Sequence, residues 1–208
     1  MIDTQFIVFL AASLLLIITP GQDMILVMSR SIGQGAKAGV ATAAGVSVGL
    51  LGHTILATLG LGAILRASEM LFVAVKIIGA GYLLYLGFRL IMSKQEEIKI
   101  KNSESRSLKT LFIQGALSNL SNPKIAIFYF AFLPQFIPEN AANPTIMLLM
   151  LGFTFALLTF LVKAPIGYGA GRLSKWLRSK PAVQVWINRI SGSVLIALGV
   201  RLAFEERV

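Results

Sequence analysis

Apolar residues fill six long stretches of this chain, and short polar segments separate them. Each stretch is long enough to cross about 30 Å of hydrocarbon at roughly 1.5 Å per residue. Since lipid offers the backbone no hydrogen-bond partner, such stretches form helices or closed barrels, and these are too continuous for alternating barrel strands. The pattern predicts an all-α integral membrane protein with six transmembrane helices, at approximately 5–22, 38–65, 68–92, 111–135, 144–170 and 183–204.

Helix-breaking motifs interrupt the first and the fourth stretch. They are Thr19-Pro20-Gly21-Gln22-Asp23 and Asn119-Leu120-Ser121-Asn122-Pro123-Lys124. Pro123 follows Pro20 by 103 positions (123 − 20), which is close to half of the 208 residues. Broken helices at matching points of two halves indicate the central binding site of a transporter.

The long polar segment 93–110 divides the chain near its centre. We expect residues 1–92 to form a first three-helix repeat, 93–110 a cytoplasmic linker and 111–208 a second repeat. An odd number of spans in each half reverses the second half, so the prediction is an inverted-topology repeat. The alternative is six helices in which the two prolines coincide by chance.

The charge balance supports a membrane location. The net charge is +10, but the basic residues lie in short segments between apolar stretches, so we expect no nucleic-acid partner. Eleven of them fall in three alternate connections, around residues 23–37, 93–110 and 171–182, and two fall in the other connections. The positive-inside rule then places both termini outside, in the periplasm, and three loops in the cytoplasm.

The first break offers an acid. Pro20-Gly21 should open the first helix, and the residues that follow should restart as a helix. Asp23 is placed to cap that new start. Alternatively, Asp23 presents its carboxylate to a substrate ammonium or to a proton, because an acid inside a membrane is costly and usually functional.

The second break offers the opposite polarity. Asn119 and Asn122 supply amides, Pro123 breaks the helix and Lys124 adds an ammonium, so Asp23 and Lys124 can act as complementary poles for a zwitterionic amino acid. The alternative for Lys124 is that it extends to the cytoplasmic interface.

Two further residues are candidates for proton coupling beside Asp23. His53 lies in the second stretch, and histidine is a residue type suited to a proton relay, although a lone histidine is more often a hydrogen-bonded packing residue. Lys163 precedes Ala164-Pro165, which we interpret as a third helix break. Lys163 either faces the cavity or reaches the cytoplasmic headgroups.

Two other classes of protein stay open at this point, an intramembrane enzyme and a passive channel or metal-ion exporter. The chain has no cysteine and one histidine, which leaves few nucleophile–base pairs for an enzyme and few ligands for a metal. A Walker A loop is absent from the sequence, so we expect no ATP drive, and neither a metal nor a cofactor is expected.

The motifs resemble those of the LysE/RhtB superfamily of amino-acid exporters. The resemblance lies in the segment Thr19 to Arg30, in the spacing of Gly45, Gly49 and His53, and in the segments Gly115 to Lys124 and Phe132 to Phe136. It covers the whole chain in length, number of spans and motif order. One departure is Gln22, where the family commonly has a second proline, but Pro20-Gly21 should preserve the break.

The resemblance implies a secondary exporter of amino acids or their derivatives in the bacterial inner membrane, coupled to proton influx. The substrate would bind between the broken first and fourth helices. Asp23 would contact its ammonium or carry the proton, while Asn119, Asn122 and Lys124 would orient its carboxylate. The expected partners are the substrate, protons, the lipid bilayer and a second copy of the chain in a homodimer.

Overall fold

The computed structural model describes residues 4–67, 69–93, 105–137, 141–170, 172–173 and 180–204, and within these ranges every regular element is a helix. The helices are α1 (Thr4–Ile18), α2 (Gln22–Gln34), α3 (Ala36–Ala67), α4 (Glu69–Met92), α5 (Leu108–Leu120), α6 (Pro123–Phe132), the 3-10 helix η1 (Leu133–Phe136), α7 (Pro144–Tyr168) and α9 (Pro181–Phe204).

The predicted apolar stretches coincide with helices. The bounds of α3, α4, α7 and α9 agree with the predicted second, third, fifth and sixth stretches to within two residues. Among the described residues, α3, α7 and α9 contain segments long and apolar enough to cross a membrane, and α1 with α2 forms a fourth candidate that is bent by 52°. The all-α class is confirmed, and the six spans in two inverted repeats stay a prediction.

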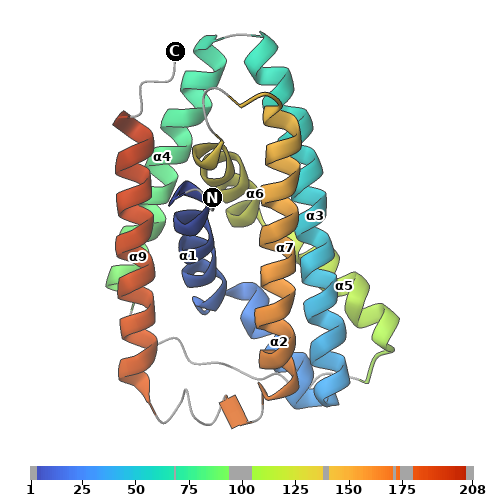
Figure 1. Ribbon diagram of the computed structural model, residues 1–208. Helices are drawn as coiled ribbons and strands as arrows, with labels where there is room; N and C mark the ends of the chain where they lie inside the picture. The colour runs from blue at the N-terminus through green and yellow to red at the C-terminus, as the bar shows by residue number, and fades with distance from the viewer. Residues whose placement is uncertain are drawn as a thin grey trace.

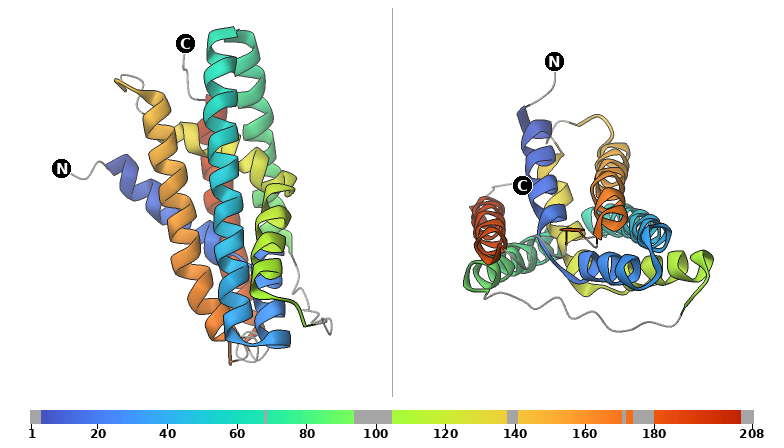
Figure 2. Two further views of the ribbon diagram at one scale, coloured as in Figure 1. Left: turned by 90° about the vertical axis from the view of Figure 1, so that its right-hand side faces the viewer. Right: turned by 90° about the horizontal axis from the view of Figure 1, so that it is seen from below.

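The helices form two packed groups with the broken helices between them (Figures 1 and 2). α4 packs along α9 at one side, and at the other side α3 packs against both α5 and α7. α1 and α6 lie between these groups in Figure 1 and in the right-hand view of Figure 2. The two helix breaks therefore lie inside the bundle.

Glycines allow α3 to approach its neighbours closely. A Cβ atom on Gly45 would overlap the carbonyl of Phe112, and one on Gly49 would lie 2.7 Å from the carbonyl oxygen of Ala116, so α5 packs directly on the backbone of α3. Gly45 and Gly49, four residues apart on α3, thus form a helix-packing surface. It holds the end of α5, which carries Asn119, against α3.

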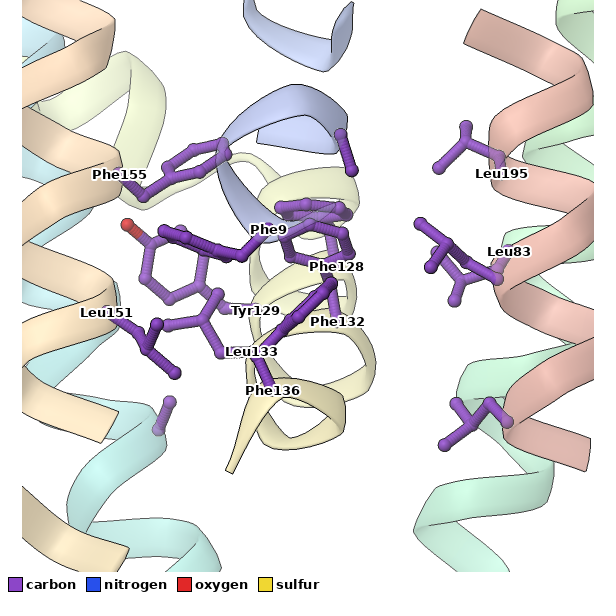
Figure 3. Close-up of a cluster of buried hydrophobic side chains, with 14 of the residues drawn as sticks. Phe9, Leu83, Phe128, Tyr129, Phe132, Leu133, Phe136, Leu151, Phe155 and Leu195 are labelled. Carbon is purple, nitrogen blue, oxygen red and sulfur yellow. The ribbon is translucent and has the colours of Figure 1, made fainter. Parts of the chain in front are cut away.

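An aromatic cluster joins α1 to the end of the second broken segment (Figure 3). The ring of Phe9 lies 6.0 Å from that of Phe132 and 5.3 Å from that of Phe136, and all three side chains are buried. Such pairs stabilise a core beyond their buried area. The cluster fixes α1 relative to α6 and η1, and so fixes the helix ends that meet at the breaks.

Both predicted breaks are confirmed. α1 ends at Ile18 and α2 begins at Gln22, so the break persists with Gln22 in place of a second proline. α5 ends at Leu120 and α6 begins at Pro123.

The predicted third break at Pro165 is wrong, because α7 continues through Pro165 to Tyr168. Pro165 lies in the last turn of α7. Its missing N–H removes one helical hydrogen bond, but few residues of the helix follow that position. Its carbonyl accepts a hydrogen bond of 2.9 Å from the N–H of Gly169, and the Ser31 hydroxyl of α2 bonds to the carbonyl of Gly167. These contacts hold the end of α7 in helical form.

Candidate functional site

Asp23 lies in the first turn of α2 and turns its carboxylate into the bundle. Its Oδ2 atom accepts hydrogen bonds from the side-chain amide of Asn119 at 2.9 Å and from the ammonium of Lys163 at 3.4 Å. The interpretation of Asp23 as a helix cap is wrong. The N-cap of α2 is Gly21, without a side-chain hydrogen bond, because the Asp23 carboxylate is directed toward α5 and α7 instead.

The contact between Asp23 and Lys163 is a buried ion pair. The exposed fractions of these residues are 6% and 7%, respectively, so Lys163 does not reach the surface of the bundle. The second oxygen of Asp23, Oδ1, is buried and accepts no hydrogen bond from the described residues. Burial of an unpaired acceptor is costly, so a half-satisfied carboxylate inside a membrane protein marks a candidate functional site.

Asn119 links this ion pair to His53. The main-chain carbonyl oxygen of Asn119 lies 3.0 Å from Nε2 of His53, while the side-chain amide of Asn119 donates to Asp23. Because a carbonyl only accepts, Nε2 of His53 carries the hydrogen in this contact. The three candidates for proton coupling, His53, Asp23 and Lys163, therefore belong to one polar cluster, and Asn119 is its centre.

A cavity of about 80 Å³ lies at this cluster. Asp23 and Lys163 are the charged residues that line it, and Asn122 adds an amide. The wall is otherwise mostly apolar and comes from α1, α3, α4, α6, α7 and α9, with the side chains of Leu16, Ile17, Leu50, Leu86, Leu90, Ile125, Phe128, Phe155 and Leu195. A polar end and an apolar wall in one cavity suit a small amphipathic ligand.

Several of the predicted site residues lie at the cavity. Asp23, Gly21 and Asn122 line the cavity, and Asn119 and His53 lie directly behind it. The side chains of Pro123 and Lys124 lie outside the described residues. Among the described cations, Lys163 is the one that contacts Asp23.

Comparison with known proteins shows which family the chain belongs to. Residues 14–206 match the family described as LysE type translocator. The chain belongs to this family. The LysE/RhtB resemblance read from the motifs is therefore confirmed, and the protein is a multi-pass membrane translocator.

Relatives of this LysE type translocator match over almost their whole length. The uncharacterised membrane protein YrhP of Bacillus subtilis is 32% identical over 95% of this chain and 97% of its own. The uncharacterised membrane protein PA4757 of Pseudomonas aeruginosa is 28% identical over 96% and 95%. A leucine efflux protein of an Enterobacter strain is 28% identical over the same shares. No solved structure matches the chain.

Three polar residues that line this cavity were not predicted from the sequence. Thr159 lines the cavity one helical turn before Lys163, and the spacing of four residues on one helix could have revealed it. Thr19 also lines the cavity, and its hydroxyl lies 2.6 Å from that of Ser191 on α9. Gln22 reaches across the break, with its amide 3.4 Å from the Ser118 hydroxyl of α5. No sequence signal distinguishes Ser191 or Ser118 from other serines.

Proposed function

We propose that this translocator exports amino acids or their derivatives from the cytoplasm, by secondary transport through the cavity between the two helix breaks. The observation that carries the proposal is the buried pair of Asp23 and Lys163 at that cavity. An amino acid has one positive and one negative pole, and the cavity offers a partner for each. The leucine efflux protein among the relatives supports the same class of cargo.

The apolar wall indicates where the rest of the substrate lies. Leu86 and Leu90 of α4, Phe128 of α6 and Leu195 of α9 line the cavity. Burial of an apolar side chain is favourable by about 25 cal/mol for each Å² removed from water. Amino acids with aliphatic side chains, such as leucine, are therefore the substrates we would test first.

The cavity must widen to bind such a substrate. Ligand sites generally enclose about 300–1,000 Å³, whereas this cavity measures about 80 Å³. Transport then consists of opening toward the cytoplasm, binding, closing and opening toward the periplasm, as the two halves rock around the site. In this scheme Asn119 and Asn122 orient the substrate at the helix breaks, and Lys124 at the start of α6 adds a further positive charge.

Proton influx is the proposed driving force. His53, Asn119, Asp23 and Lys163 form a continuous series of polar contacts, and both histidine and a buried acid are suitable proton carriers. The proposed setting is the bacterial inner membrane with both termini in the periplasm. A homodimer is a further proposal.

Counterflow in proteoliposomes tests the proposal. Vesicles are loaded with one unlabelled amino acid at a time, and uptake of labelled leucine is compared between the wild type and Asp23→Asn. We expect exchange for one class of amino acids and its collapse in Asp23→Asn. If Asp23 carries the proton instead, exchange persists in this variant but loses its pH dependence. Folded wild-type protein that exchanges no amino acid would overturn the proposal.

A further inference from the structure

Lys163 occupies the position at Asp23 that the ammonium of an amino acid would take. We propose that Lys163 pairs with Asp23 before substrate binds, and that the substrate must carry both an ammonium and a carboxylate to replace this ion pair. The substrate ammonium takes the place of Lys163 at Asp23, and the released Lys163 ammonium binds the substrate carboxylate. This inference rests on the proposed amino-acid export.

The acceptors for an ammonium are present on one side of the cavity. Oδ1 of Asp23 is buried and accepts no hydrogen bond from the described residues. Pro20 has no N–H, so the carbonyl of Leu16 at the end of α1 loses its helical donor, and Leu16 lines the cavity. An ammonium has three N–H donors, and a carboxylate with a freed carbonyl can satisfy them.

Donors for a carboxylate are present at the same cavity. Lys163 has three N–H donors, and its one contact with Asp23 is long, at 3.4 Å. α2 begins at the cavity, and the first N–H groups of a helix have no partner inside it. A carboxylate beside Gln22 and Asp23 can accept from these groups as well as from Lys163.

Charge balance explains why both poles are required. The site itself contributes one negative charge, on Asp23, and one positive charge, on Lys163. An amino acid adds one charge of each sign, so the loaded site stays neutral. An amine alone leaves an excess positive charge in a buried cavity and a carboxylate alone leaves an excess negative charge, and both are strongly unfavourable.

The same balance predicts opposite changes of specificity in two variants. Lys163→Met leaves Asp23 unpaired, so a ligand with a single ammonium restores neutrality. Asp23→Asn leaves Lys163 unpaired, so a ligand with a single carboxylate restores neutrality. A residue that only held the fold together would weaken the binding of all ligands alike.

Calorimetric binding to the full-length protein in detergent tests the inference without interference from membrane permeation. The probes are leucine, 3-methylbutylamine, which lacks the carboxylate, and 4-methylpentanoate, which lacks the ammonium. We expect the wild type to prefer leucine over both analogues by at least about tenfold. The preference should shift toward the amine in Lys163→Met and toward the carboxylate in Asp23→Asn, by a similar factor.

Two control variants accompany these. Lys163→Arg keeps the charge and should keep the wild-type order of ligands. Lys37→Met removes an exposed lysine of α3 and should leave all three affinities unchanged. Thermal unfolding of each variant verifies that it is folded.

The outcomes are distinct. A wild type that binds the amine as tightly as leucine overturns the inference, even if a variant does not fold. Equal loss of affinity for all three ligands in folded Lys163→Met and Asp23→Asn overturns the inference as well. In either case, leucine counterflow by the wild type leaves the proposed function intact. Absence of both leucine binding and amino-acid exchange in the wild type would overturn the proposed function itself.

Discussion

Asp23 and Asn119 lie 96 positions apart in the chain, and the amide of Asn119 donates a hydrogen bond of 2.9 Å to the carboxylate of Asp23. The contact joins the first turn of α2 to the last turn of α5, and so joins the two helix breaks directly. Asn119→Leu removes this donor from a buried carboxylate. We expect a loss of about 1–3 kcal/mol in the free energy of unfolding and a decrease in leucine counterflow of at least about tenfold, measured in proteoliposomes.

Asn188→Leu is the matched control for this prediction. Asn188 of α9 is also buried, and its amide donates a hydrogen bond of 2.8 Å to the Ser93 hydroxyl, away from the cavity. This variant should lose stability to a similar degree while its counterflow remains close to that of the wild type. Equal transport losses in the two variants would mean that Asn119 acts only through stability.

Gly49→Ala should displace Asn119, which lies behind the cavity. A Cβ atom at Gly49 would lie 2.7 Å from the carbonyl oxygen of Ala116 and 2.9 Å from Oδ1 of Asn119, so the end of α5 must shift. Overpacking of this kind costs about 1–3 kcal/mol, and the shift moves Asn119 relative to Asp23. We expect a lower melting temperature and slower counterflow.

Gly81→Ala provides the comparison, because a Cβ atom at Gly81 has nothing within 4 Å. Alanine is favoured over glycine inside a helix by up to about 1 kcal/mol. The melting temperature of this variant should therefore stay the same or rise slightly. If Gly49→Ala behaves like Gly81→Ala in both assays, the close packing of α3 on α5 does not position Asn119.

The fold was largely predictable because hydropathy and proline act locally. Apolar stretches of membrane length fixed the helices, and Pro20 and Pro123 fixed the two breaks, since a missing N–H interrupts a helix wherever it occurs in mid-span. The prediction of a helix break at Pro165 was wrong for the same reason. Its effect depends on how many residues of helix follow it and on contacts from α2, which a local pattern does not contain.

The partner of Asp23 was not predictable from the sequence. Lys163 lies 140 positions after Asp23 in the chain, near the end of the apolar helix α7. Whether it meets Asp23 depends on the rotation of α7 about its axis and on its packing against α3. That rotation is set by contacts such as Gly167 against Gly39, which involve residues far apart in the chain.

His53→Gln separates proton coupling from structure. Glutamine can donate a hydrogen bond to the carbonyl of Asn119, as Nε2 of His53 does at 3.0 Å, but it does not titrate. If His53 carries the coupled proton, leucine counterflow at equal pH should stay within about threefold of the wild type. Leucine export driven by an inward proton gradient should fall to the level measured without a gradient.

A drop in both assays would instead assign His53 a structural role at Asn119. His53→Leu is the companion variant, because it removes both the donor and the titrating group. It should lose counterflow as well as gradient-driven export, and unchanged export in His53→Leu would exclude His53 from the coupling pathway.

The ion pair of Asp23 and Lys163 should also affect the thermal stability of the protein. Removal of one partner leaves an uncompensated charge in the bundle, which typically costs about 3–5 kcal/mol, so Asp23→Asn and Lys163→Met should each lower the melting temperature clearly. In the double variant neither charge remains. Because replacement of a whole buried pair is often close to neutral, the double variant should be more stable than either single variant. Thermal unfolding of all four proteins in one detergent completes the cycle. Losses that simply add would show that the two charges do not interact, and would remove the basis for a pair that the substrate replaces.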